Sequence, residues 1–192
     1  HALDLEELAT CESTIAALPA LDGIVHCGFG QIVKQGIERG DYVDVVSAFH
    51  RAVGGLYHAT RAALPALKAS GRERPGRPSI VAVSSSVTHE PPPPTWTAYT
   101  VAKSALIGLV RSLAVELGPH GIRVNAVSPS LVETTENRAL PPRILDDFRS
   151  RSPLGRLATP SDVAQGVAFL CSEQSSFLTG VDLPVTGGMV MP

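Results

Sequence analysis

A tyrosine and a lysine four positions apart, Tyr99 and Lys103, open a segment of regular helical periodicity. The i, i+4 spacing places the phenol and the ammonium group on one face of a helix, within reach of each other. A phenol has an unperturbed pKa of about 10, but a neighbouring cation favours the phenolate and lowers that pKa. Such a pair suits general acid/base chemistry on a carbonyl or an alcohol. Alone the pair is a weak signal, because the same spacing occurs at the ends of many amphipathic helices.

Hydroxyl and proline residues follow two apolar runs that have the pattern of buried strands, at 79–84 and 122–128. The first run ends in Ser84, Ser85 and Ser86, and the second is followed by Pro129 and Thr134. The carboxyl ends of parallel strands meet at one edge of a sheet, and ligands of open α/β sheets bind at that edge. We therefore expect these residues and the start of the helix at Tyr99 to line one crevice.

The elements that must position this crevice alternate along the chain in the pattern of βα units. Four short runs rich in Val and Ile are predicted to be buried parallel strands, at 21–27, 79–84, 122–128 and 181–185. Helices are predicted at 41–67 with an interruption near Gly54 and Gly55, from Tyr99 to Gly118, and from Pro160 onward. Polar stretches at 70–78 and 89–97 are predicted to be surface loops. The pattern predicts an α/β fold with a parallel sheet.

Composition and charge exclude several classes of protein. The 192 residues carry 16 Lys and Arg against 18 Asp and Glu, a formal charge of −2, so no basic field is available to bind nucleic acid. Charged residues, Gly or Pro interrupt every apolar run before it reaches the length of a membrane span. Three widely spaced cysteines favour a reducing cytoplasm over a disulfide scaffold. His26 and Cys27 lack further ligands at metal-binding spacing, so they are predicted to be a packed pair, and no metal site is expected.

Several ordered motifs together resemble the short-chain dehydrogenase/reductase family. They are Val-Ser-Ser at 83–85, Ala-Tyr-Thr-Val-Ala-Lys at 98–103, Gly-Ile-Arg-Val-Asn-Ala-Val-Ser-Pro at 121–129 and the closing segments at 152–156, 168–172 and 178–188. The similarity runs from Asp4 to the C-terminus. It implies one Rossmann-like domain over residues 1–192, a doubly wound parallel sheet in a three-layer αβα arrangement.

The resemblance implies an NAD(P)-dependent oxidoreductase that transfers a hydride between a nicotinamide cofactor and a ketone or secondary alcohol, with reduction favoured. Tyr99 would be the acid/base, while Lys103 would lower its pKa and hold the nicotinamide ribose. Ser85 would hydrogen-bond the reacting oxygen, and Ser86 remains the alternative. The implied cofactor contacts are Asp4, Leu5, Gly28, Tyr99, Lys103, Pro129 and Thr134. The choice between NAD and NADP is left open.

The family also implies how the substrate and other subunits bind. Segment 135–153 matches a variable substrate lid that is mobile until a ligand orders it. The proline run at 91–94 is either part of the substrate pocket or a stiff surface loop. A small carbonyl or alcohol is the expected substrate, no membrane or nucleic acid partner is expected, and the helices at 41–67 and 99–118 resemble those that the family pairs in dimers and tetramers.

The chain departs from the family pattern at three places. The glycine-rich turn of the first βαβ unit is missing, and we expect that unit to precede His1 in a longer chain or to be supplied separately. His-Cys-Gly-Phe at 26–29 stands where the family has Asn-Asn-Ala-Gly, and the relay asparagine of the helix near 45–55 is absent. These departures favour the alternative function, a non-catalytic family member that serves as a subunit or assembly module without cofactor binding.

Overall fold

The computed structural model describes residues 8–18, 21–30 and 32–191. Its four strands are β1 (Gly23–His26), β2 (Ser79–Val83), β3 (Arg123–Pro129) and β4 (Asp182–Val185). They form one sheet in the order β1-β2-β3-β4, and every neighbouring pair is parallel. All four predicted strands are therefore confirmed, with ends that differ by one or two residues from the predicted ones. The α/β, parallel architecture is confirmed as well.

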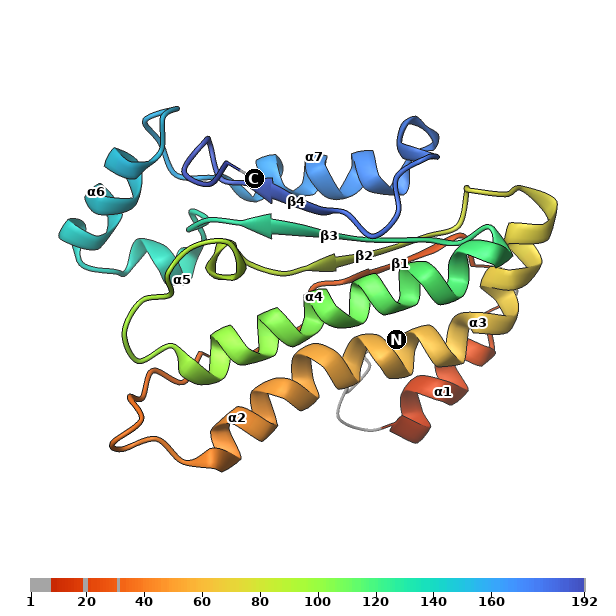
Figure 1. Cartoon of the computed structure of the whole chain (residues 1–192), viewed down its shortest axis with the longest axis horizontal. Coiled ribbons are helices and arrows are strands. Elements are labelled where there is room, and N and C mark those ends of the chain that lie inside the picture. The colour runs from red at the N-terminus through yellow and green to blue at the C-terminus, as the bar shows by residue number, and fades with distance from the viewer. Residues whose placement is uncertain (1–7, 19–20, 31, 192) are drawn as a thin grey trace.

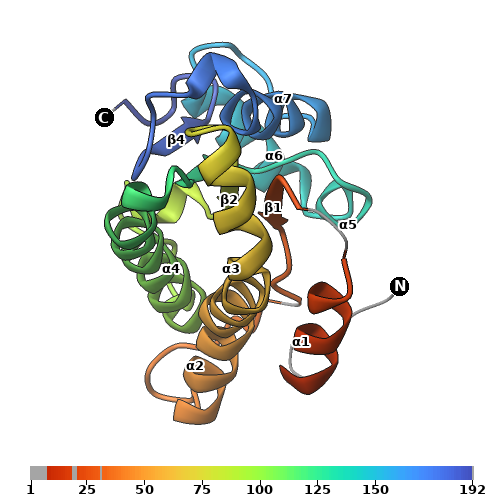
Figure 2. The same cartoon turned by 90° about the vertical axis from the view of Figure 1, so that its right-hand side faces the viewer.

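Helices connect the strands and cover both faces of the sheet (Figures 1 and 2). The helices are α1 (Leu8–Ala16), α2 (Tyr42–Phe49), α3 (Gly55–Glu73), α4 (Thr97–Leu117), α5 (Thr135–Arg138), α6 (Pro142–Arg151) and α7 (Pro160–Cys171). Helices α3 and α4 pack on one face of the sheet, with α1 against α3 and α2 against α4, and α7 packs on the other face. Single turns of 3₁₀ helix lie at Ser86–Thr88, Gly118–His120 and Glu173–Ser175. The result is the three-layer arrangement expected from the sequence.

A π-helical turn, His50–Gly54, joins α2 to α3 and accounts for the predicted interruption of the long helix. The turn continues the right-handed path, so α2, the π-turn and α3 form one bent rod beside α4 (Figure 1). Such π-turns are rare and occur often at functional sites. This one packs against the residues that follow β1, as described below.

The end of α3 corrects one prediction, because the stretch at 70–78 is not wholly a loop. The helix continues to Glu73. Ser70 Oγ donates a hydrogen bond of 2.6 Å to Asp22 Oδ1, and Gly71 packs directly on the backbone of His120, where a Cβ would lie 2.2 Å from the carbonyl oxygen. Tertiary packing thus extends the helix over polar and small residues whose own propensity favours a loop.

Two apolar clusters, one on each face, hold the sheet between its helices. The larger combines β2 and β3 with α3 and α4 and includes Leu56, Leu67, Ile80, Leu106 and Val124. The smaller joins Val81, Val127 and Leu170 under α7. Burial of both faces fixes the strands in register, so the carboxyl ends of β2 and β3 are held side by side.

Candidate active site

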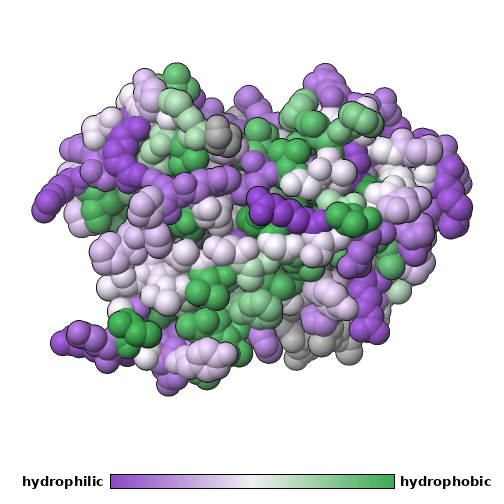
Figure 3. All heavy atoms as spheres, in the orientation of Figure 1, coloured by the Kyte–Doolittle hydropathy of each residue, from purple (hydrophilic) through white to green (hydrophobic). Residues whose placement is uncertain are grey.

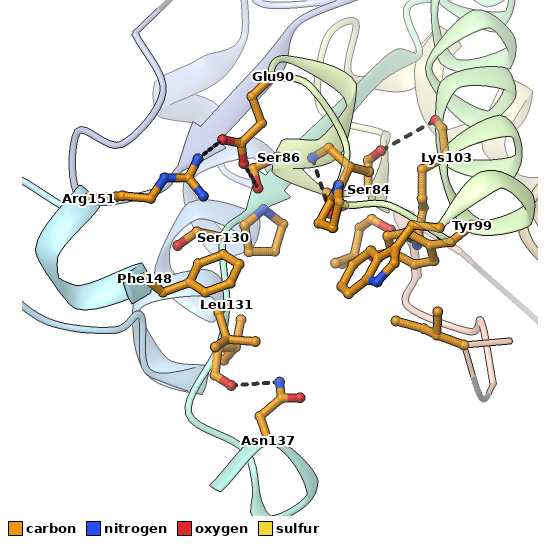
Figure 4. A pocket seen from close by; sticks show the side chains of 18 of the residues that line it. Ser84, Ser86, Glu90, Tyr99, Lys103, Ser130, Leu131, Asn137, Phe148 and Arg151 are labelled. Atoms are coloured by element: carbon orange, nitrogen blue, oxygen red, sulfur yellow. Dashed lines mark hydrogen bonds and ion pairs between the residues drawn. The ribbon is translucent and has the colours of Figure 1, made fainter. Parts of the chain in front are cut away.

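A cleft of about 280 Å³ lies at the carboxyl ends of β2 and β3 (Figure 4). Five of the residues predicted for the site line it: Ser85, Tyr99, Lys103, Pro129 and Thr134. Strand β2 runs directly into the serines, β3 ends at Pro129, and Tyr99 lies in the first turn of α4. The structure therefore brings two strand ends and one helix start to the same crevice, the place where open α/β sheets bind ligands.

Ser85 and Ser86 have different partners in the structure. Ser85 is 8% exposed, its hydroxyl lowers the pKa of the Tyr99 phenol, and it accepts from the backbone N–H of Val87 at 3.4 Å. The hydroxyl of Ser86 donates to Glu90 Oε1 at 3.2 Å. Because the hydroxyl of Ser85 acts on the pKa of the phenol while that of Ser86 is bonded to Glu90, the geometry favours Ser85 over Ser86 as the partner of Tyr99.

Burial raises the pKa of Tyr99, and the hydrogen bond from Ser85 lowers it only in part. The ammonium nitrogen of Lys103 lies over the face of the tyrosine ring, 5.7 Å from its centroid. Burial is the larger effect, because removal of water disfavours the phenolate, and the lowering of the phenol pKa by Lys103 stays a prediction. The phenol keeps its proton at neutral pH.

Lys103 is itself a buried cation, only 4% exposed. Its Nζ donates to the carbonyl oxygen of Val83 at 2.9 Å and lies 4.7 Å from the centroid of the Phe29 ring. Burial lowers the pKa of the ammonium group to about 8, against a smaller opposing effect of Cys27. The carbonyl and the aromatic face compensate in part for the water that the ammonium group has lost.

The unusual His-Cys-Gly-Phe segment packs between the π-turn and the Tyr99–Lys103 pair. The Phe29 ring meets the Tyr99 ring edge to face, with centroids 5.0 Å apart, and the Phe29 carbonyl accepts from Arg51 Nε of the π-turn at 3.0 Å. His26 is 4% exposed and hydrogen-bonds to the backbone of Ala52, and burial together with Lys103 lowers its pKa to about 4. The packed role predicted for His26 is consistent with this environment, whereas the ring contacts of Phe29 were not expected.

The structure gives different positions to two other predicted cofactor contacts, Gly28 and Thr134. Gly28 is in the loop after β1, next to Phe29, and does not line the cleft. Asp4 and Leu5 lie outside the described residues. Thr134 is the N-cap of α5, where its hydroxyl accepts from the backbone N–H of Asn137 at 3.2 Å.

Most of the remaining cleft wall is apolar. The residues on it include Ile32, Val87, Pro91, Pro93, Trp96, Leu131, Val132 and Phe148. The proline run therefore contributes to the cleft through two of its members, which fits the first of the two alternatives. Segment 135–153 also reaches the cleft, through Asn137, Phe148 and Arg151.

Two charged residues of the cleft, Glu90 and Arg151, were missed by the sequence analysis. They form an ion pair across 61 positions of sequence. Glu90 directly precedes the proline run and Arg151 is the last residue of α6, so neither belongs to a local motif. Opposite charges at such a separation carry no signal in a single sequence.

Within residues 8–18, 21–30 and 32–191, no three His, Cys, Asp or Glu side chains gather in a way that could hold a metal ion. Among the same residues, no helix is long and apolar enough to cross a membrane.

Comparison with known proteins relates the whole chain to oxidoreductases. A family described as enoyl-(acyl carrier protein) reductase matches residues 3–190. The (3R)-3-hydroxyacyl-CoA dehydrogenase of Canis lupus familiaris is 39% identical over 137 residues, which cover 71% of this chain and 51% of that protein. Oxidoreductase UcpA of Salmonella typhimurium is 31% identical over an alignment that covers 98% of this chain and 74% of that protein. The chain spans about half the length of the first of these relatives.

Solved structures agree with this relationship. A short-chain type dehydrogenase/reductase from Mycobacterium ulcerans superposes with a TM-score of 0.90 at 27% identity, over 98% of this chain and 69% of that one. A 3-oxoacyl-[acyl-carrier protein] reductase from Brucella melitensis gives a TM-score of 0.87 at 27% identity, over 100% of this chain and 71% of the other.

Proposed function

The chain belongs to the short-chain dehydrogenase/reductase family, and on that basis we propose that it is an NAD(P)-dependent oxidoreductase that reduces a ketone to a secondary alcohol. The observation that carries the proposal is that Ser85, Tyr99 and the buried Lys103 line one largely apolar cleft, with the Ser85 hydroxyl near enough to act on the pKa of the phenol. A family member that had lost catalysis would not need to keep these three side chains together in one cleft. Ser85, Tyr99 and Lys103 are the proposed catalytic residues.

The cleft residues fit the nicotinamide end of such a cofactor. An ammonium group has three N–H donors, and Lys103 uses one of them on the Val83 carbonyl. The remaining donors are available to the hydroxyl groups of a ribose. Pro129 and Thr134 line the same cleft. When bound, the nicotinamide supplies or accepts the hydride.

Each proposed catalytic residue has a distinct task. Tyr99 carries a proton at its Oη because burial raises its pKa, and that proton is the one a carbonyl oxygen needs as it is reduced. Ser85 holds the reacting oxygen next to the phenol through its hydroxyl. The positive charge of Lys103 stabilises the phenolate that remains after proton transfer. The protonated phenol at neutral pH supports reduction as the favoured direction.

Binding and turnover together test the proposal. We expect the natural protein to change the fluorescence of NADH or NADPH in a saturable manner and to reduce ketones with one of them. Tyr99→Phe should leave cofactor binding intact and lower turnover by a factor of about 10² to 10⁴. Turnover that survives this substitution would refute the assigned role of Tyr99. A protein that gives no saturable response to either cofactor would instead be the non-catalytic family member considered above.

We further propose that copies of the chain pair through α2, α3 and α4. Large apolar side chains on these helices are exposed, namely Tyr42, Val43, Phe49, Tyr57, Val101 and Val115. Figure 3 shows hydrophobic surface gathered over the same helices. Such a surface is typical of an interface rather than of a free face. Light scattering should therefore give a dimer or a tetramer, and a monomer at every concentration would contradict the pairing.

A further inference from the structure

The ion pair between Glu90 and Arg151 forms part of the cleft wall (Figure 4). One carboxylate oxygen of Glu90 accepts from Arg151 Nη2, and the other accepts from the hydroxyl of Ser86, the residue after Ser85. The side chain of Glu90 is 15% exposed and that of Arg151 is 44% exposed. The pair thus joins the loop that follows β2 to the end of α6, across the cleft.

Both partners are held in place by their neighbours in sequence. His89 Nε2 lies 2.8 Å from Asp182 Oδ2, and the hydroxyl of Ser128 donates to Asp182 Oδ1 at 2.5 Å, so the residue before Glu90 packs against the start of β4. Ser152 is 6% exposed, and its hydroxyl donates to the carbonyl oxygen of Gly187 at 3.1 Å, so the residue after Arg151 is fixed as well. The geometry of the pair is therefore built into the fold, unlike that of a mobile surface ion pair.

The charges of the cleft are few and unevenly placed. Of the residues that line the cleft, three carry a formal charge: Lys103, Glu90 and Arg151. Lys103 is at the catalytic end beside Tyr99, whereas Glu90 and Arg151 neutralise each other away from it. Asp147 adds a longer and exposed contact, with Oδ2 3.9 Å from Arg151 Nη1. Beyond the catalytic residues, the cleft wall is therefore mostly apolar, and its two charged groups, Glu90 and Arg151, are paired with each other.

We propose that the Glu90–Arg151 pair is a specificity determinant that makes the cleft accept neutral carbonyl substrates and disfavour those with a carboxylate at the far end. This inference rests on the proposed function for its effect on turnover. A carboxylate near the pair meets the carboxylate of Glu90 as well as the guanidinium of Arg151, whose charge Glu90 already neutralises. The attraction between such a carboxylate and the cleft therefore does not offset the free energy that the carboxylate loses when it is removed from water.

Opposite single substitutions should change the selectivity in opposite directions. Glu90→Gln leaves the guanidinium of Arg151 without its carboxylate partner, so the preference for a carboxylate-bearing substrate should rise by about tenfold. Arg151→Gln leaves the carboxylate of Glu90 unpaired, so the same preference should fall below that of the natural protein. Restoring a pair with reversed polarity, Glu90→Arg with Arg151→Glu, should return the selectivity toward its natural value.

Selectivity is measured with two matched ketones and a matched control variant. The ketones are a straight-chain methyl ketone and the keto acid of equal length with its carboxylate at the opposite end, compared by kcat/KM. Arg149→Gln is the control, since Arg149 lies on the same helix and pairs with Asp146 at 2.8 Å without lining the cleft. It should leave the ratio unchanged. A ratio that moves in the same direction in Glu90→Gln and Arg151→Gln, or in neither, would overturn the proposal.

Binding without turnover separates this inference from the proposed function. Trp96 lines the cleft and is the single tryptophan of the chain, so its fluorescence can report the binding of a straight-chain carboxylate and of the alcohol of equal length. Opposite shifts of the two affinities in Glu90→Gln and Arg151→Gln would support the inference even if no ketone were reduced. Normal turnover with unaltered binding selectivity would refute the inference and leave the proposed function standing.

Discussion

Replacing Lys103 with methionine is expected to stabilise the fold at neutral pH. Lys103 is 4% exposed, and burial lowers the pKa of its ammonium group from 10.5 to about 8. A pKa difference of this size corresponds to about 3 kcal/mol of unfavourable free energy for the charged folded state. Methionine has a similar length, but it cannot make the hydrogen bond to the Val83 carbonyl, which contributes about 1 kcal/mol. The free energy of unfolding should therefore rise by about 2 kcal/mol at pH 7.

The gain should disappear at alkaline pH. Between pH about 8 and 10.5 the unfolded chain keeps the proton on Lys103 that the folded chain releases. The unfolded state then binds more protons, so the stability of the natural protein rises with pH through this window and its disadvantage fades. At about pH 10 less than about 1 kcal/mol of the charge penalty remains, and the natural protein and the variant should be about equally stable.

Urea unfolding at both pH values, followed by circular dichroism, measures the two free energies. Lys68→Met is the matched control, because it makes the same chemical change at a partly exposed lysine of α3. Turnover should be lost in Lys103→Met and retained in the control. A stability gain that is the same at both pH values would refute the reasoning, because the gain would then not come from the buried charge.

Two further predictions concern packing and acid stability. Gly71→Ala should destabilise the protein by about 2 kcal/mol, since its Cβ would meet the backbone of His120, whereas Gly108→Ala in the open middle of α4 should stabilise it by up to about 1 kcal/mol. Thermal unfolding of both variants checks this, and equal effects would contradict it. Because burial lowers the pKa of His26 from 6.5 to about 4, the unfolded chain takes up a proton first as the pH falls, and stability is lost in that window. His26→Asn should remove about 3 kcal/mol of this acid sensitivity, and an unchanged pH dependence of unfolding would show that His26 is not its source.

The strands and the main helix could be predicted because their signals are local. The runs at 79–84 and 122–128 are apolar, β-branched and bounded by turn residues, and the helix at Tyr99 has one apolar stripe that ends at a glycine. Those patterns depend only on neighbouring residues. Since parallel strand ends share one edge, they also sufficed to bring Ser85, Tyr99 and Lys103 to one place.

The finer parts of the site depend on contacts between distant segments. The Phe29 ring lies against Lys103, and Arg51 of the π-turn donates to the Phe29 carbonyl. Gly54 and Gly55 indicated an interruption of the helix there, but no local pattern indicated these contacts. The choice between Ser85 and Ser86 depends on the 3₁₀ turn that follows β2, because that turn sends one hydroxyl to Tyr99 and the other to Glu90. Three consecutive serines have the same local propensity, so the sequence favoured Ser85 by strand register but left Ser86 open.

The parallel order of the sheet has a consequence for how the chain folds. Neighbouring strands β1 to β4 are each separated by a helical connection, so no pair in the described sheet can form as a local hairpin. Two neighbouring strands can pair only after the helical connection between them has brought them together. Contacts between residues so far apart in sequence slow folding. The unit β2-α4-β3 is the smallest part in which two central strands and their covering helix meet. Until it forms, the Val-rich segments of β2 and β3 are exposed to other chains, and refolding yield should fall as protein concentration rises.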